Sequence, residues 1–409
     1  MYKRQLWRLP RTPRASGPLP ASAYVWQLRH GNAVRAAMTE RLGRFEHATI
    51  LAAEVRIADG HVTTQRVDLA ADVLGGRPIA LAIRVGPHPL EPRDPFADSL
   101  VDLALDVVAD ARAKQLDVAE LQLDYDCPSS RLAAYAEFLE RLAENLDDLD
   151  DAPSLTVTAL PTWLTRDEMT AVADAVSLYV LQLHSLEQPE DVTDEVSLFD
   201  ADRARGYVER AGRLGRPFRI SLPSYGYLAT FGADGRFLGL VAETAPRPLP
   251  DGAVQRSLMA DANQLSRFVV SLNDDRPASL QAIAWYRLPV DGDRLAWRWS
   301  TLERVMKGEP VEPALVVEAR PRPDDPLLVE LVLRNDGSSD APAPAQLVVE
   351  HGALMAADAH AGFTMTRRSP RSMTVHTRAP LRLPPGEQRV VAWLRRTTTQ
   401  QEVRADADG

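Results

Sequence analysis

Two aspartates, Asp124 and Asp126, lie two residues apart in the run Leu121–Asp126, where apolar and polar side chains alternate. Alternate residues of a strand point to the same face, so both carboxylates and Gln122 share one face. Paired carboxyl groups perform general acid–base catalysis when their surroundings hold them at different pKa values. Asp126, nearest the end of the run, is therefore the candidate acid, and Asp124 is a candidate partner.

Charged and hydroxyl side chains of the neighbouring runs are expected on the same inward face. Glu54 is a second candidate partner carboxylate, and Arg84 supplies a cation on the strand next to Asp124. Buried carboxylates need such partners, because an unpaired buried charge is costly. The alternative is a self-satisfied network of ion pairs that only stabilises the fold. The polar residues expected on this face are Glu54, Arg56, Arg84, Gln122, Asp124, Asp126, Thr156, Thr158, Gln182 and His184.

Aromatic residues are concentrated near the ends of these runs and in the segments that follow them. Flat aromatic rings beside carboxylates suit the C–H faces and hydroxyl edges of a sugar ring. For Trp297 and Trp299 the alternative is packing against a following domain. Arginine and histidine side chains would bind hydroxyl groups and hold the carboxylates at different pKa values. The residues expected to bind a substrate are Arg84, Trp163, His184, Tyr225, Trp285 and Arg287.

The elements that position these residues are eight short apolar or alternating runs with amphipathic stretches between them. This alternation is typical of βαβ units, and eight units predict a (β/α)8 TIM barrel whose lumen holds the polar face. Strands are expected at Ala23–Leu28, Ile50–Arg56, Ala80–Val85, Glu120–Asp126, Leu155–Leu160, Tyr179–His184, Phe218–Pro223 and Gln281–Arg287. Helices are expected at Ala33–Phe45, Phe96–Lys114, Leu132–Leu146, Arg166–Val176, Ala201–Leu214 and Val254–Leu272.

The connection from Ser224 to Gly252 is too long for an ordinary βα loop. It contains a hairpin-like turn at Gly232–Gly235, flanked by Phe231 and Phe237. We expect this segment to form a flap over the cleft of the barrel.

Helical periodicity ends near Gly308, and short strands separated by Pro-, Asn- and Gly-containing turns follow. This pattern predicts a small C-terminal β-sandwich of the immunoglobulin-like type. The expected division is a flexible leader over 1–22, the barrel over 23–309, the sandwich over 313–397 and a frayed tail over 398–409. The sandwich strands are expected at Ala314–Arg320, Leu327–Asn335, Gln346–His351, Met373–Thr377 and Arg389–Leu394.

Composition excludes several classes of function. The formal net charge is -10 with interleaved signs, so we expect no nucleic-acid partner. No apolar run approaches about 18 residues, so we expect no transmembrane segment. Without a Gly-rich phosphate loop or a zinc-type His/Cys spacing, we expect no cofactor and no metal. Cys127 is the single cysteine and leaves the redox compartment open, and Met1–Ser22 lacks the apolar core of a signal peptide.

Several motifs together resemble an uncharacterised bacterial domain family of glycosidase-like (β/α)8 barrels. They are Leu121–Pro128, Ala159–Trp163, Leu222–Tyr227 and Trp285–Pro289. The likeness extends over roughly Tyr24 to Gly308 and implies a barrel of the glycoside hydrolase type, with no established substrate. It also implies a periplasmic, envelope-attached or secreted location, which the N-terminus does not support.

The fourth-strand motif also looks like the more distant chitinase-like pattern D-x-x-D-x-D-x-E. Asp124 and Asp126 match its two inner aspartates. Pro128 takes the position of the catalytic glutamate and Leu121 that of the first aspartate, so half of the motif is absent. Either another carboxylate serves as the acid or the site is no longer catalytic.

Three functions follow as hypotheses. The first is a glycoside hydrolase-like enzyme acting on a polysaccharide, with Asp126 as acid and Asp124 or Glu54 as its partner. The second is a non-catalytic carbohydrate-binding barrel, in which arginines would hold both aspartates ionised. The third is another small-molecule barrel enzyme, because barrels support many chemistries.

Overall fold

The computed structural model describes residues 12–58, 61–184, 189–194, 196–241, 249–378 and 381–407. Its contacts divide the chain into two units. The first consists of Met1–Glu187, Ser197–Tyr225 and Phe268–Gly292. The second consists of Gln188–Val196, Gly226–Arg267 and Asp293–Gly409.

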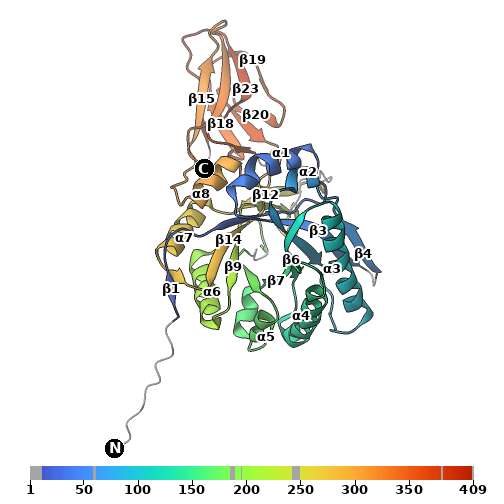
Figure 1. Ribbon diagram of the computed structural model, residues 1–409. Coiled ribbons are helices and arrows are strands. Elements are labelled where there is room, and N and C mark those ends of the chain that lie inside the picture. Colours follow the sequence, from blue (N-terminus) through green and yellow to red (C-terminus); the bar gives the residue numbers. More distant parts are fainter. Residues whose placement is uncertain are drawn as a thin grey trace, which may run out of the picture. The chain divides into compact units, whose positions relative to one another are not determined.

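The first unit contains a barrel of eight parallel strands (Figure 1). These are β2 (Ala21–Val25), β3 (His47–Ala58), β5 (Pro78–Val85), β6 (Asp117–Tyr125), β7 (Ser154–Ala159), β8 (Leu178–Gln182), β9 (Phe218–Pro223) and β14 (Leu280–Tyr286). The barrel is closed, because β2 pairs with β14 on one side and with β3 on the other. Each predicted strand overlaps one of these eight, so the predicted (β/α)8 barrel is confirmed.

A further strand, β4 (His61–Arg66), pairs antiparallel with the C-terminal half of β3. The sequence did not predict β4. All six of its residues are exposed, so it lacks the alternation of buried and exposed residues on which strand prediction depends.

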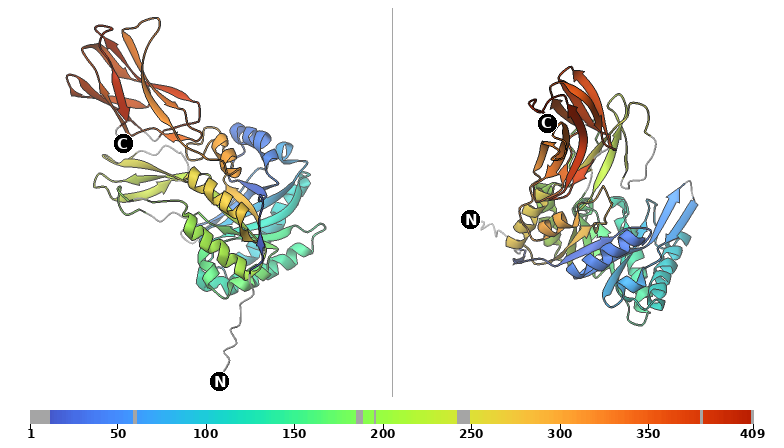
Figure 2. Two further views of the ribbon diagram at one scale, coloured as in Figure 1. Left: turned by 90° about the vertical axis from the view of Figure 1, so that its left-hand side faces the viewer. Right: turned by 90° about the horizontal axis from the view of Figure 1, so that it is seen from above.

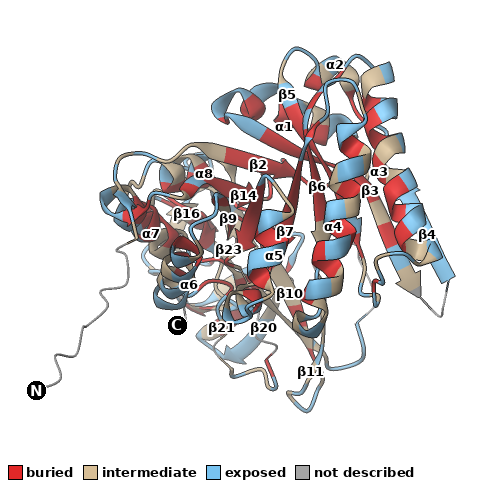
Figure 3. Cartoon of the chain, turned by 60° about the horizontal axis from the view of Figure 1, so that its bottom comes forward, coloured by how far each residue is buried: buried red, intermediate tan, exposed pale blue. Residues whose placement is uncertain are grey.

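The helices between the strands bury one face, as α3 (Pro95–Ala113) illustrates. The Asp94 carboxylate caps this helix by accepting a hydrogen bond from the Ala97 N–H at 2.7 Å. Figure 3 shows buried residues along one side of α3 and of α4 (Leu132–Asp147). The others are α1 (Asn32–Arg41), α2 (Ala71–Leu74), α5 (Met169–Asp174), α6 (Ala201–Leu214), α7 (Ala262–Asp274) and α8 (Trp299–Met306). In the described ranges no helix is long and apolar enough to cross a bilayer.

A three-stranded antiparallel sheet in the second unit contains the predicted hairpin. Its strands are β10 (Gly226–Phe231), β11 (Phe237–Val241) and β12 (Val254–Met259). The helix predicted over Val254–Leu272 is therefore wrong in its first part, because these residues pair with β10 along its whole length. Short apolar runs do not distinguish a strand from a helix by periodicity alone. The role of a flap stays a prediction.

The C-terminal residues form two four-stranded antiparallel sheets (Figure 2). One contains β15 (Leu315–Pro321), β16 (Leu328–Asn335), β23 (Gln388–Arg396) and β19 (Leu354–Ala359), and the other β20 (Phe363–Ser369), β21 (Ser372–Thr377), β18 (Gln346–Glu350) and β24 (Arg404–Ala407). Side chains from both sheets share one core, as a sandwich requires. The frayed tail is a partial error, because β24 completes the second sheet by pairing with β18.

The predicted flexible leader also needs correction over residues 12–22. In this segment β1 (Arg14–Ala15) pairs with β13 (Arg276–Pro277), and β2 begins at Ala21. The Arg14 guanidinium donates to Glu209 at 2.7 Å and to Asp275 at 2.6 Å. Backbone pairing and these ion pairs hold the proline-rich segment on the barrel unit. Residues 1–11 of the predicted leader lie outside the described residues.

Candidate functional site

The lower lumen of the barrel is filled by buried polar side chains that bond to each other across it. The Tyr24 hydroxyl on β2 donates to Gln122 on β6 at 2.8 Å, and Arg219 on β9 donates to Glu120 on β6 at 2.8 Å. Thr156 donates to the same Glu120 carboxylate at 2.7 Å. Neither β2 nor β9 neighbours β6, so these side chains meet through the lumen, to which Gln122 and Thr156 were predicted to point. This layer stabilises the barrel and corresponds to the purely structural alternative.

Asp124 lies one layer above, nearer the C-terminal ends of the strands. Its Oδ1 accepts hydrogen bonds from Thr158 at 2.6 Å and from Gln182 at 3.4 Å. Burial raises the pKa of Asp124 to about 6, although the Thr158 hydroxyl and the Arg84 charge act to lower it. The nearby Asp126 carboxylate raises this pKa further. Asp124 is therefore protonated in a large fraction of molecules at mildly acidic pH.

Arg84 stands between two carboxylates in the strand register. It is opposite Glu54 on one side and Asp124 on the other, and it is exposed. Glu54 pairs with Arg56 at 2.7 Å. By contrast, neither Asp124 nor Asp126 forms an ion pair with any residue that the structure describes. The Arg84 charge therefore acts on Asp124 without a direct ion pair between them.

Asp126 is the most accessible of the candidate carboxylates. It follows the last residue of β6 and is exposed. Its side chain shares the parity of Asp124, two residues earlier. The described ranges contain no group of three His, Cys, Asp or Glu side chains placed to hold a metal ion.

His184 lies just after β8, two strands from β6 in the barrel. Its Nε2 lies 3.2 Å from the Ser221 Oγ, and its Nδ1 lies 3.4 Å from the Tyr225 hydroxyl. The imidazole stacks on the Tyr286 ring with a centroid separation of 5.3 Å. Burial lowers the pKa of His184 to about 4. The ring is thus neutral at physiological pH and can exchange donor and acceptor roles with the two hydroxyls.

Tyr286 is a site residue that the sequence analysis missed. Its ring contacts those of Tyr24, Trp26 and Tyr225 with centroid separations of 5.6, 5.3 and 5.2 Å. The alternation of inward and outward side chains along β14 could have predicted its position. Ala284 is in register with Ser221, which faces the lumen, so the residue two positions later faces the lumen as well.

Two tryptophans predicted to bind substrate are placed elsewhere. Trp285 is only 1% exposed, because it has the opposite parity to Tyr286 and points away from the lumen. Trp163 is fully buried, with its indole N–H donating to the Cys127 carbonyl at 3.0 Å and its ring against Tyr135. Their predicted contact with a substrate is wrong, because both rings belong to the core.

Other predicted residues lie at the site or beside it. Tyr225 is largely buried and reaches the site through its hydroxyl. Arg287 is also buried, and a role for it in binding stays a prediction. Thr158 and Gln182 face the lumen as predicted. Their hydrogen bonds to Asp124 were not predicted. Which inward side chains touch each other depends on strand stagger, which the sequence does not reveal.

Comparison with solved structures finds other barrels at low sequence identity. A chitinase from Chromobacterium violaceum is 13% identical over 71% of this chain and 98% of its own, with a TM-score of 0.47. The spore cortex-lytic enzyme SleL of Bacillus cereus is 12% identical over 72% of this chain and 75% of its own, with a TM-score of 0.46. A chitinase from Bacteroides thetaiotaomicron is 12% identical over 66% and 90%, with a TM-score of 0.45. No curated protein sequence matches the chain.

Two family models match the sequence directly. One, described as a domain of unknown function (DUF8456), matches residues 318–397 in the sandwich. The other, described as a domain of unknown function (DUF3142), matches residues 75–291, which include β5 to β14 and the residues around Asp124 and His184. This match extends over more than half of the 409 residues, so the chain belongs to the DUF3142 family.

Proposed function

We propose that this protein is a glycoside hydrolase-like enzyme that cleaves a polysaccharide at the C-terminal ends of the barrel strands. The observation that carries the proposal is the state of Asp124. Its carboxyl group is largely buried, is held through one oxygen by Thr158 and has a pKa raised to about 6. Glycosidic cleavage needs one such protonated carboxyl group and one ionised partner.

The two roles are the reverse of those predicted from position along the strand. Asp124 is the better proton donor, because its environment keeps the proton bound at mildly acidic pH. Asp126 is exposed at the strand end and takes the role of the partner carboxylate.

Neighbouring side chains would orient the acid and the sugar. Thr158 and Gln182 both bond to Oδ1 of Asp124, which leaves Oδ2 to carry the transferable proton. His184, neutral and partly accessible, provides a polar ring edge, and Tyr286, on which it stacks, provides an aromatic face. The carbohydrate class itself comes from the resemblance of the four sequence motifs to glycosidase-like barrels.

A non-catalytic carbohydrate-binding barrel is the competing function, favoured by Pro128 at the position of the chitinase-like glutamate. For a binding barrel, we expected arginines to hold both Asp124 and Asp126 in the ionised state. The raised pKa of Asp124 and its hydroxyl and amide partners support the enzyme instead.

The test is release of reducing ends from a panel of bacterial and plant polysaccharides between pH 5 and 8. Wild type is compared with Asp124→Asn, Asp126→Asn and the exposed control Asp106→Asn. Cleavage by wild type and by the control, lost in both site variants, supports the enzyme. Oligosaccharides that raise the melting temperature of wild type without any cleavage would replace the proposal with the binding barrel.

A further inference from the structure

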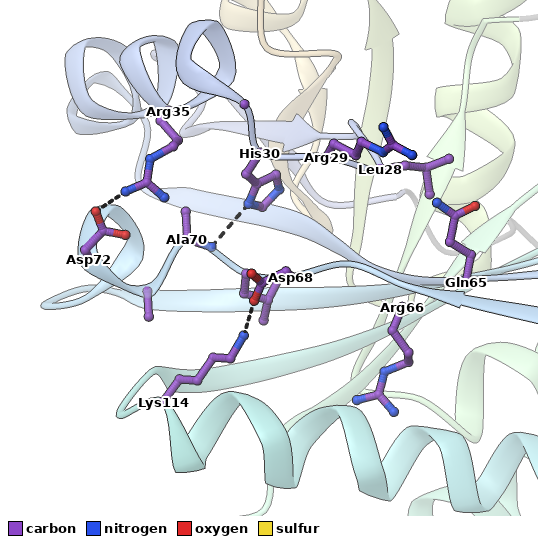
Figure 4. A pocket seen from close by; sticks show the side chains of 13 residues that line it. Leu28, Arg29, His30, Arg35, Gln65, Arg66, Asp68, Ala70, Asp72 and Lys114 are labelled. Carbon is purple, nitrogen blue, oxygen red and sulfur yellow. Dashed lines mark hydrogen bonds and ion pairs between the residues drawn. The ribbon is translucent and has the colours of Figure 1, made fainter.

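A surface pocket of about 640 Å³ lies in the barrel unit, and none of its lining residues belongs to the lumen site (Figure 4). Its walls are the loop after β2, the first turn of α1, the end of β4, the segment leading into α2 and the end of α3. A volume of this size is typical of small-molecule sites and exceeds that needed for a single ion.

Cationic side chains dominate the lining. Four of them, Arg29, Arg35, Arg66 and Lys114, face two carboxylates, Asp68 and Asp72. Lys114 pairs with Asp68 at 2.5 Å, and Arg35 pairs with Asp72. Arg66 pairs with Asp110, which is outside the lining. The pocket therefore has an excess of positive charge.

The ion pairs of the pocket leave its cations available. The Asp68 side chain is 95% exposed and that of Asp72 is 64% exposed, so water competes for both carboxylates. Arg29 is exposed and has no ion pair with any residue in the described ranges. A ligand oxyanion can take the place of the exposed carboxylates, and arginine forks match carboxylate and phosphate groups in two-point contacts.

A backbone hydrogen bond holds His30 at the wall of the pocket. Its Nδ1 accepts a hydrogen bond from the Ala70 N–H at 3.3 Å, which places the ring proton on Nε2 (Figure 4). This Nε2 is buried and has no hydrogen-bond partner among the described groups.

The start of α1 adds to the positive potential. Gly31 is its N-cap, without a side-chain hydrogen bond, and the first turn contains no acidic residue. The first N–H groups of a helix and its dipole favour an anion at this end. Gly31 and Arg35 both line the pocket.

We propose that this pocket binds a small molecule through a phosphate or carboxylate group, which is held by the cations of its lining, Arg29 and Arg35 foremost. The site is independent of the lumen carboxylates. The arginine side chains recognise the oxyanion of the ligand. An uncharged sugar lacks this group, so we expect it not to bind.

The test is calorimetric titration of the full chain with glucose 6-phosphate, glucuronate and glucose. We expect an acidic sugar to bind and glucose not to bind, and the tighter of the two acidic sugars identifies phosphate or carboxylate. Arg29→Gln should weaken binding about tenfold or more. Arg44→Gln, which removes an exposed arginine outside the pocket, should bind as wild type does, and so should Asp124→Asn.

Two results would overturn the proposal. One is the absence of heat from both acidic sugars at millimolar concentration with folded protein. The other is equal weakening by Arg29→Gln and Arg44→Gln, which would show a general charge effect. Because Asp124→Asn removes the proposed acid and leaves this pocket intact, failure here is distinguishable from failure of the proposed hydrolase.

Discussion

Asp124 in the lumen and Asp68 in the surface pocket both lie near a cation, yet their pKa values move in opposite directions. Burial raises the pKa of Asp124 to about 6, and the Arg84 charge does not offset it. The hydrogen bond from Lys114 lowers the pKa of Asp68, which is exposed. Desolvation therefore outweighs a nearby charge in the lumen, whereas on the surface a direct hydrogen bond decides the outcome.

The two histidines extend this comparison. Burial lowers the pKa of both, to about 4 for His184. In the lumen the neutral His184 ring has hydroxyl partners for both nitrogens, whereas the His30 Nε2 in the pocket has none. The lumen thus contains protonatable groups that can transfer protons, and the pocket keeps fixed cations that can bind an anion.

The largest expected effect is on catalysis. Asp124→Asn should reduce the release of reducing ends by about 10²- to 10⁴-fold, because proton donation contributes that much. In wild type the rate should fall as pH rises through about 6, where Asp124 loses its proton. Rate measurements across this range check both statements. An unchanged pH profile in an active Asp124→Asn variant would remove Asp124 from the mechanism.

The same substitution, Asp124→Asn, should make the folded protein more stable at high pH while it reduces activity. The folded-state pKa of Asp124 is raised from 3.8 to about 6, so its ionisation destabilises the folded protein above pH 6. Asp124→Asn should raise the free energy of unfolding at pH 8 by at most about 3 kcal/mol, less where solvent reaches the carboxylate. The gain should shrink as pH falls through 6 and vanish near pH 4. Urea unfolding at these pH values measures it, with Asp106→Asn as the flat control.

Thr158→Val should produce a smaller change. It removes the hydroxyl that lowers the pKa of Asp124, so the pH at which the rate falls should move upward. We also expect a loss of about 1 kcal/mol in stability at neutral pH, the usual value of one hydrogen bond. Thr64→Val on the exposed β4 is the matched control. A rate that drops without any shift of the pH profile would indicate general disruption instead.

The smallest effect is expected at Asp68. Asp68→Asn frees Lys114 from its ion pair and should strengthen anion binding a few-fold, with little change in stability because the pair is exposed. Titration with glucose 6-phosphate at low salt checks the first part, and thermal unfolding checks the second. Weaker binding after this substitution would mean that Asp68 contacts the ligand itself.

The sequence predicted which side chains of a strand point into the lumen. It did not predict which of them touch each other across the barrel. The alternation in Leu121–Asp126 correctly placed Gln122 and Asp124 in the lumen. The Glu120–Arg219 ion pair joins residues 99 positions apart, and nothing in either strand alone indicates it. Trp285 was misplaced because a bulky aromatic residue at a strand end suits a rim and a core equally well.

The pairing of β1 with β13 has a consequence for synthesis of the chain. Arg14 contacts Asp275, 261 residues later, and β2 meets its neighbour β14 only beyond that point. During synthesis, the edge of β2 that pairs with β14 therefore stays unpaired until nearly three hundred residues have left the ribosome. Until then, the unpaired edge of β2 is open to pairing with another strand.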